Sequence, residues 1–415
     1  MYRIMRIKKL FSVIIALCLI AVTFVMNVSA EDEGIRLIYE IETHNYAFSE
    51  SSSAQETQYL SYLSIGSQEL RECIFEGLYN CQAQIDISKF GFLPTQENCD
   101  MLGDFIWKEM PEAFHVGNKM SFNGCTDLLV YINLEYNCTA EEYQTMYADF
   151  EKSANDMVKD LKGGNLTDVQ KALLLHDRLA IKCEYDYENL KNGTLSYKVY
   201  TAYGALVEGL AVCQGYAEAY DYLLEKVGID SILCSSDALN HAWNIVYIDG
   251  KPYHVDVTWD DPVYENPTQK PAGYVSHKNF LLSSDALKAT DHVAKNEDDS
   301  EIVDYNTSPT DTTYDSYFWQ NSFSEFHLMG NNIYYFNNNG AFCGYDEKMP
   351  LVDAGLGDIN GDKKIDAMDV SRCRQFLVET ETPEDTSVKA CDINKDGKIN
   401  ILDLVHFKRV LIYIG

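Results

Sequence analysis

The fold of this chain is decided by residues 240–262, whose sequence is Asn240-His-Ala-Trp-Asn-Ile-Val-Tyr-Ile-Asp-Gly-Lys-Pro-Tyr-His-Val-Asp-Val-Thr-Trp-Asp-Asp-Pro262. The dipeptide Asp249-Gly250 is among the strongest signals for a two-residue β-turn, and apolar and aromatic residues flank it on both sides. The segment therefore predicts an antiparallel hairpin. A two-residue turn places Asp256 opposite Trp243 and on the same face as His241, diagonally adjacent to it.

This hairpin brings an imidazole next to a carboxylate that can orient it, as a cysteine nucleophile requires. His254 lies on the same face, and spacing alone does not exclude it as the catalytic histidine. Its other interpretation is a histidine that packs between strands. The pairing also depends on the turn, because a three-residue turn would put His241 and Asp256 on opposite faces.

A helix is predicted over residues 213–227, because apolar side chains recur there at helical spacing. Cys213 would be its first residue, where unpaired N–H groups and the helix dipole favour a thiolate. A thiolate beside an oriented histidine is the machinery of cysteine hydrolases and acyltransferases. The alternative is a small buried core cysteine, which is the commonest fate of an unpaired cysteine.

Four motifs fall within residues 203–262: Tyr203-Gly-Ala-Leu-Val-Glu-Gly209, Val212-Cys-Gln-Gly-Tyr-Ala217, His241-Ala-Trp-Asn244 and Val255-Asp-Val-Thr-Trp-Asp260. They resemble the core of the transglutaminase-like superfamily, and most of all its bacterial, cysteine-peptidase-like branch. The resemblance implies an α+β fold with a papain-like core, in which the cysteine-bearing helix packs on an antiparallel sheet. We expect this catalytic domain, with a helical N-terminal part, over residues 60–290.

The resemblance also assigns roles to individual residues. It implies a triad of Cys213 as nucleophile, His241 as base and acid, and Asp256 as the residue that orients the histidine. The Cys213 backbone N–H is expected to hold the oxyanion, with Tyr203 as a candidate second donor. Trp243 and Trp259 are candidates to flank the substrate cleft, with core packing as the alternative. Cys183 and Cys234 match no motif and are interpreted as structural.

The C-terminal region contains an internal repeat. Asp358-Ile-Asn-Gly-Asp-Lys-Lys-Ile-Asp-Ala-Met-Asp369 recurs 34 residues later as Asp392-Ile-Asn-Lys-Asp-Gly-Lys-Ile-Asn-Ile-Leu-Asp403. Acidic or amide side chains occupy positions 1, 3, 5, 9 and 12 of each copy, which is the ligand spacing of a calcium loop, and position 7 contributes its carbonyl. A surface made only of Asn and Asp turns would not produce two matched copies, each followed by an amphipathic helix.

Residues 356–415 resemble a type I-like dockerin module, a small all-α domain that binds two Ca²⁺ and docks onto the cohesin of a scaffoldin in a cellulosome. The resemblance implies the ligands Asp358, Asn360, Asp362, Lys364, Asp366 and Asp369 in the first loop, and Asp392, Asn394, Asp396, Lys398, Asn400 and Asp403 in the second. Lys363 replaces the usual glycine of the first loop, which would strain or weaken that site.

Cohesin contact is expected, by the same resemblance, at the two residues before the last ligand of each loop. These residues are apolar: Ala367, Met368, Ile401 and Leu402. Further along the helices, Arg374, Lys408 and Arg409 either add charged contacts or lie on solvated helix faces.

The remaining segments have less specific patterns. Basic residues followed by an apolar run and a small-residue site predict a secretory signal over residues 1–30, with an uncleaved anchor as the alternative. We expect a polar leader over residues 31–59, mostly helical structure to residue 162 with a strand at 127–134, and a linker with a short β segment over 291–355. Capping boxes at Thr139 and Thr167 predict two helix starts.

Composition excludes nucleic acid as the main partner. The chain has 33 Lys and Arg against 64 Asp and Glu, a net charge of -31, whereas binding a phosphate backbone needs a positive surface. Of 12 cysteines, one lies in the predicted signal; the other 11 allow five disulfides and one free thiol, or none, and connectivity cannot be deduced from sequence.

The sequence therefore predicts a secreted, cellulosome-bound cysteine hydrolase, a peptidase or amidase that acts on protein or peptide through a thioester, without a catalytic cofactor and without membrane attachment after signal cleavage. Two alternatives remain open: a protein-crosslinking transglutaminase, and a non-catalytic domain that binds protein or glycan. A glycoside hydrolase is disfavoured, because no paired-carboxylate motif is evident.

Overall fold

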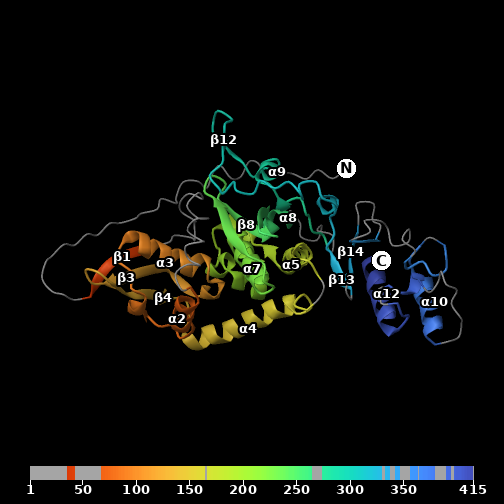
Figure 1. Ribbon diagram of the computed structural model, residues 1–415, viewed down its shortest axis with the longest axis horizontal. Coiled ribbons are helices and arrows are strands. Elements are labelled where there is room, and N and C mark those ends of the chain that lie inside the picture. Colours follow the sequence, from red (N-terminus) through yellow and green to blue (C-terminus); the bar gives the residue numbers. More distant parts are fainter. Residues whose placement is uncertain are drawn as a thin grey trace. The chain divides into compact units, whose positions relative to one another are not determined.

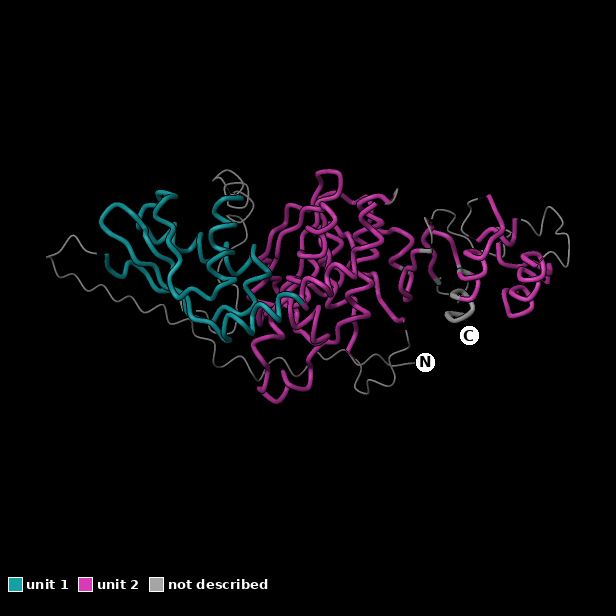
Figure 2. Tube along the Cα trace, turned by 90° about the horizontal axis from the view of Figure 1, so that it is seen from below, with its two compact units in different colours: residues 1–148 teal, residues 149–415 magenta. Residues whose placement is uncertain are grey.

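The computed structural model describes residues 35–42, 67–163, 166–263, 273–329, 332–336, 342–345, 356–362, 364–378, 389–393 and 397–414. The chain divides into two compact units, residues 1–148 and 149–415 (Figure 2). Helices and antiparallel sheets occur in both, which confirms the α+β prediction. The predicted signal over residues 1–30 lies outside the described ranges. Within those ranges, no helix has the length and apolarity needed to cross a membrane.

The first unit contains a four-stranded antiparallel sheet in the order β1–β3–β4–β2 (Figure 1). Its elements are β1 (Arg36–Glu42), α2 (Ser67–Tyr79), β2 (Gln84–Asp86), α3 (Gln96–Lys108), β3 (Val116–Gly124) and β4 (Leu129–Tyr136). Apolar side chains of α2 and α3 share one buried core with the sheet, to which Ile74, Ile106 and Phe122 contribute fully buried side chains.

Strands β1, β2 and β3 of this sheet differ from the sequence prediction, while β4 confirms the strand expected at 127–134. Both β3 and the short strand β2 lie in the segment predicted to be mostly helical. Asn, Lys and Ser interrupt the apolar positions of β3, but Met120 and Phe122 still point into the core. β1 lies in the predicted polar leader, where Tyr39 and Ile41 alternate with charged residues and pack on the same core.

The second unit is built on an antiparallel sheet in the order β10–β9–β8–β7. Helix α7 packs on β7 and β8, and α5 packs on α7; β8, α7 and α5 are labelled in Figure 1. Helix α4 (Ala140–Val158) begins in the first unit and ends in the second. The main elements of the second unit are α5 (Asp168–Lys182), α7 (Cys213–Glu225), β7 (Ser231–Ser236), β8 (His241–Ile248), β9 (Lys251–Val255) and β10 (Phe280–Leu282). Both predicted capping boxes are formed, by Thr139 with Glu142 and by Thr167 with Gln170.

The hairpin β8–β9 has the predicted two-residue turn. Ile248 pairs with Lys251, and Asn244 with Val255. Asp249 and Gly250 have φ values of 51° and 74°, which are the left-handed values that a tight hairpin turn requires. The register that was deduced from the turn is therefore confirmed.

Smaller elements complete the second unit: β5 (Glu184–Tyr185), α6 (Tyr187–Asn192), β6 (Leu210–Ala211), α8 (Val257–Asp260), α9 (Ser284–Lys288), β11 (Ala294–Lys295), β12 (Glu301–Ile302), β13 (His327–Met329), β14 (Asn332–Phe336), β15 (Phe342–Gly344), α10 (Ala367–Leu377) and α12 (Ile401–Ile414). The expected short β segment is the sheet β13–β14–β15. α10 and α12 share a small core that includes Cys373 and Phe407.

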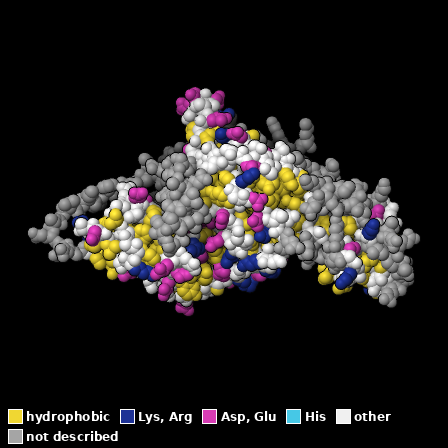
Figure 3. Space-filling model, in the orientation of Figure 1, with side chains coloured by type: hydrophobic (Ala, Val, Ile, Leu, Met, Phe, Trp, Pro, Cys, Tyr) yellow, Lys and Arg dark blue, Asp and Glu magenta, His cyan; other side chains and the backbone are white. Residues whose placement is uncertain are grey.

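Residues 291–314 differ from the predicted linker. His292 and Tyr305 are buried, although polar residues surround them in sequence. Only residues 295–301, around the turn that joins β11 to β12, are uniformly exposed, and this segment is the tip of the β11–β12 hairpin. It carries Glu297, Asp298, Asp299 and Glu301, which form the acidic protrusion near the top of Figure 3. Part of the negative charge thus lies on this tip.

Candidate active site

The start of α7 positions Cys213. The preceding residue, Val212, has an apolar side chain that cannot cap the helix, so it does not occupy the N–H groups of the first turn. Gly215 allows the helix to approach the preceding segment closely, because a Cβ at this position would lie 2.6 Å from the Val199 carbonyl oxygen. The half-buried Cys213 is thereby held at a helix end that favours an anionic sulfur.

His241, the first residue of β8, lies between Cys213 and Asp256. Its Nε2 is 2.6 Å from Asp256 Oδ2, and the ring also hydrogen-bonds to the Cys213 sulfur. Burial lowers the pKa of His241, but the charge and hydrogen bond of Asp256, together with Cys213, outweigh burial and raise this pKa to about 10. His241 is therefore an imidazolium at neutral pH.

Asp256 follows β9 and caps α8. Its Oδ1 accepts the backbone N–H of Trp259 at 3.1 Å, and its backbone N–H donates to the Asn279 carbonyl. Burial raises the pKa of Asp256, but the positive charge and hydrogen bond of His241 outweigh burial and hold it well below its usual range. The structure thus brings all three residues of the predicted triad together, with Asp256 ionised.

The structure also distinguishes the two histidines of the hairpin, because His254 has different partners from His241. His254 Nδ1 accepts the indole N–H of Trp243 at 3.0 Å, and its Nε2 lies 3.0 Å from Ser284 Oγ. Burial, followed by the charge of His292, lowers the pKa of His254 to about 3. A neutral histidine with both nitrogens engaged in this way packs between elements.

The two tryptophans differ in exposure. The His241 ring stacks on both, with centroids 5.6 Å from Trp243 and 5.0 Å from Trp259. Trp243 is 1% exposed and belongs to the core, whereas Trp259 is 36% exposed and accessible to a ligand.

Two tyrosines are relevant to the oxyanion. Tyr203 is buried, and Lys198 Nζ lies 5.4 Å from its ring centroid. Tyr185, which sequence reasoning missed, lies in β5, paired in parallel with β6 just before Cys213. Burial, followed by interaction with Cys213, raises its pKa, so its hydroxyl stays protonated and can donate. A two-residue strand has no periodicity that would have revealed it.

His292 was also missed. Its Nε2 lies 2.8 Å from Asp256 Oδ2, the same oxygen that His241 contacts. The sequence signal was misleading here, because His292 opens a polar segment that resembles a linker.

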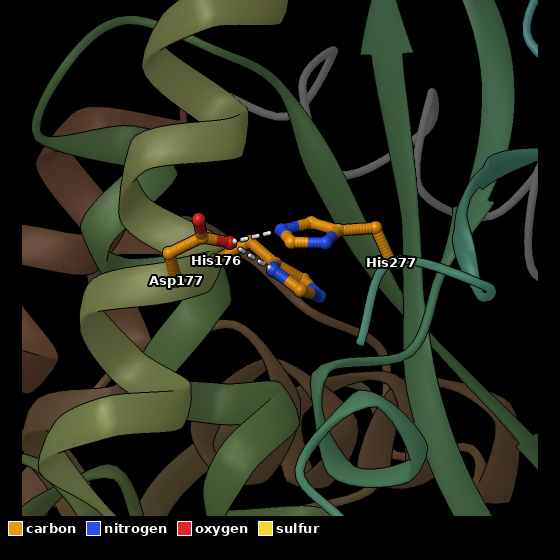
Figure 4. A group of neighbouring side chains, drawn as sticks. All are labelled: His176, Asp177 and His277. Carbon is orange, nitrogen blue, oxygen red and sulfur yellow. Dashed lines mark hydrogen bonds and ion pairs between the residues drawn. The ribbon is translucent and has the colours of Figure 1, made fainter. Parts of the chain in front are cut away.

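A second buried network lies at the other end of α8. Asp177 Oδ1 lies 2.8 Å from His176 Nδ1 and 2.9 Å from His277 Nε2 (Figure 4). His176 Nε2 lies 3.2 Å from Asp260 Oδ2, and His277 Nδ1 donates to the Ser322 carbonyl. The atoms are close enough to hold a metal ion, but hydrogen bonds already engage every ring nitrogen. We therefore interpret the network as structural: its hydrogen bond to Asp260 holds the end of α8 in place, and with it Asp256 at the start of this helix.

Replacing His176 with leucine should lower the free energy of unfolding by about 3–5 kcal/mol at pH 7, because it removes the positive charge and the hydrogen bonds that His176 gives to two buried carboxylates, Asp177 and Asp260. Burial lowers the pKa of His176, but Asp177 and Asp260 raise it to about 9. The stabilisation is therefore complete below about pH 6.5, the unfolded value, and disappears as the pH rises through about 9.

Urea unfolding of the full chain from pH 6 to 10, followed by tryptophan fluorescence, measures this effect. Lys152→Ala, which removes an exposed ion pair with Asp156, is the control and should cause no measurable change. A difference between His176→Leu and the unchanged chain that stays constant up to pH 10 would contradict the assignment of the charge to His176.

Among the described residues, the predicted calcium ligands lie in compact loops. Asp358 Oδ1 accepts the N–H groups of Gly361 and Asp362, and Asp369 Oδ1 accepts those of Ile359 and Asn360. Asp369 and Asp403 are fully buried. Carboxylate and amide oxygens wrapped by a tight backbone are the donor set that Ca²⁺ prefers, so the residues fit this ion. Asn394, Asp396 and Lys363 lie outside the described residues.

The positions predicted for cohesin contact lie on the surface. Met368 is 67% and Ile401 63% exposed, and Ala367, Leu402, Arg374 and Lys408 are exposed as well. The side chain of Arg409 lies outside the described part of α12. These positions are therefore accessible to a partner.

Two family models match parts of this chain. Residues 155–257 match the family model "Transglutaminase-like superfamily", and residues 356–412 match "Dockerin type I domain". A solved structure described as "Crystal structure of a TGase" aligns with 36% of this chain and 47% of its own length, at 14% identity and a TM-score of 0.24. The chain thus covers about half of that protein. A comparison with curated proteins found no match.

Proposed function

Because this chain contains a transglutaminase-like core domain and a C-terminal type I dockerin domain, we propose that it is a secreted cysteine hydrolase, a peptidase or amidase, that is attached to a cellulosome. The observation that carries the proposal is the line of hydrogen bonds from Asp256 through His241 to Cys213 at the start of α7. A dockerin implies a cohesin partner, and with it an extracellular, scaffoldin-bound location.

In the proposed reaction, the Cys213 thiolate attacks the carbonyl carbon of an amide. The oxyanion that forms is held by the Cys213 backbone N–H, with Tyr203 or Tyr185 as the second donor. His241, protonated at neutral pH, gives its proton to the nitrogen as the C–N bond breaks, and the amine leaves. A thioester on Cys213 remains, and His241 is neutral.

Water then completes the cycle. Neutral His241 takes a proton from water, the hydroxide oxygen attacks the thioester carbonyl, and the C–S bond breaks. The acid leaves, Cys213 returns as a thiolate, and His241 is again an imidazolium. Asp256 keeps its charge throughout and stabilises that imidazolium. The calcium loops take no part in these steps. Their two sets of oxygens would hold Ca²⁺, and the bound ions would order the dockerin.

An amine can replace water in the second half of the cycle, which would make the protein a crosslinking transglutaminase. The match of residues 155–257 to the transglutaminase-like superfamily favours keeping this second candidate. The triad is the same for both reactions, because only the acceptor of the acyl group differs.

A paired assay tests the proposal. The full chain is incubated with casein while peptide release and the incorporation of a fluorescent amine are measured side by side, with Cys213→Ala as the blank. We expect Cys213-dependent peptide release that exceeds amine incorporation. Dominant amine incorporation would support the transglutaminase instead. The absence of both signals would indicate a non-catalytic binding domain.

Alkylation of the free chain with iodoacetamide at pH 6 adds a test that needs no substrate. Burial raises the pKa of Cys81 to about 11 and that of Cys99 to about 12, so these thiols stay protonated and unreactive. Peptide mapping should find Cys213 modified first. Equal modification of Cys81 and Cys99 would contradict the proposed thiolate.

A further inference from the structure

The carboxylate of Asp256 is shared by two histidines. His241 Nε2 lies 2.6 Å and His292 Nε2 lies 2.8 Å from the same oxygen, Oδ2, and both rings are buried. An ionised carboxylate only accepts hydrogen bonds, so each of these nitrogens must carry a proton. Asp256 therefore receives one N–H group from the proposed catalytic histidine and another from a residue outside the triad.

The local structure holds His292 in this orientation. The chain turns sharply after α9 at Asp291, whose φ is 74°. The Thr290 hydroxyl lies 2.9 Å from His292 Nδ1 and 2.7 Å from the Leu287 carbonyl oxygen, so it links the ring to the end of α9. On its other side, the ring packs on Trp259, with centroids 3.9 Å apart.

The charged and titratable groups around His292 come from several elements. Asp256 and Asp260 flank α8, and His241 and His254 come from the hairpin. Burial lowers the pKa of His292, and the charge of His241 lowers it further, against the pull of Asp256. Its Nε2–H donates to Asp256 Oδ2, the oxygen that also accepts the N–H of His241.

We propose that His292 is a positioning residue for the reaction, which holds Asp256 Oδ2 in line with His241 before a substrate arrives. Trp259 N–H fixes the other oxygen, so the carboxylate plane is set from both sides. Without His292, the carboxylate can rotate about its bond to Cβ, and its alignment with His241 is lost. The inference rests on the proposed Cys213–His241–Asp256 function.

Two variants separate positioning from general packing. His292→Leu removes the donor, whereas His292→Gln keeps an N–H group at a reach similar to that of Nε2. We expect His292→Leu to lower kcat about 10- to 100-fold with KM nearly unchanged, because a small misalignment of catalytic groups has effects of this size. His292→Gln should recover most of this loss. His115→Leu, which removes a buried histidine of the first unit, controls for the loss of a buried ring.

The pH dependence of Cys213 alkylation by iodoacetamide provides a readout that needs no substrate. A misaligned Asp256 stabilises the His241 imidazolium less, so in His292→Leu alkylation should slow several-fold at pH 6–7 and match the unchanged chain near pH 10. His292→Gln should restore the profile. The proposal would be overturned by an unchanged alkylation profile in His292→Leu. It would also be overturned if both variants lost activity only in proportion to a fall in their unfolding temperature.

This experiment also separates the two levels of inference. If the alkylation profile responds to His292→Leu while casein is neither cleaved nor crosslinked, the positioning role stands and the proposed hydrolase fails. If His241→Ala leaves Cys213 alkylation of the otherwise unchanged chain unaltered, the proposed triad fails, and the role of His292 fails with it.

Discussion

Replacing Asp256 with asparagine should lower kcat/KM by about 10⁴-fold, as expected when a buried catalytic aspartate keeps its shape but loses its charge. Asp256 Oδ1 accepts the Trp259 N–H, and Oδ2 accepts the N–H groups of His241 and His292. An amide has a single oxygen. Its NH₂ group must therefore face a donor on one side or the other, and a buried donor is left without an acceptor.

The cost falls on His241 in either orientation. If the NH₂ group faces the imidazoles, Nε2 of His241 cannot keep its proton, and the proton moves to the nitrogen beside the sulfur. In both orientations the negative charge that raises the pKa of His241 to about 10 is absent, so burial lowers this pKa and the imidazolium is lost at neutral pH. The variant then has no acid to protonate the leaving amine.

Steady-state kinetics on the substrate found in the paired assay measure this effect, with the unfolding temperature as a check on folding. Asp249→Asn is a matched control, because it makes the same chemical change at the turn of the same hairpin, where Asn-Gly is as favourable as Asp-Gly. The control should retain full activity. An Asp256→Asn chain within tenfold of the unchanged chain would exclude Asp256 from the catalytic machinery.

Removing calcium should unfold α10 and α12 and abolish cohesin binding, while the activity of the Cys213 site is unchanged. The core of the dockerin consists of a few side chains, including Ile359, Cys373 and Phe407, and a core of this size does not stabilise a domain alone. Each ion at 100–1,000 times its dissociation constant adds about 3–4 kcal/mol to the folded state.

Calorimetric titration of the full chain with a type I cohesin, in calcium and then in EGTA, tests this expectation, and circular dichroism follows the helices. Asp403→Ala removes the last ligand of the second loop and should weaken binding about 100-fold or more. Asp385→Ala, an acidic residue at no ligand position of either repeat, should bind as the unchanged chain does. Cohesin binding that survives EGTA would show that calcium is not needed to fold the module.

Local chemistry explains which parts of the site could be predicted. The turn residues Asp249 and Gly250 set the register of the hairpin, and the register placed Asp256 diagonally next to His241. The loop spacing from Asp358 to Asp369 likewise depends only on residues that are close in sequence. Both patterns are short-range, because turn conformation and ligand spacing are properties of a few consecutive residues.

Long-range packing decided the rest. The sequence alone determined the two modules and the hairpin, and it predicted the calcium ligands. The tertiary structure decided that His241 rather than His254 contacts Asp256, that Trp243 is buried, and that His292 returns to the same carboxylate. It also decided that His176 hydrogen-bonds to Asp260, far away in the chain, and so holds α8 in place. No local pattern reports such contacts, because they form only when the sheet and helices pack and bury these polar groups together, where each must find a partner.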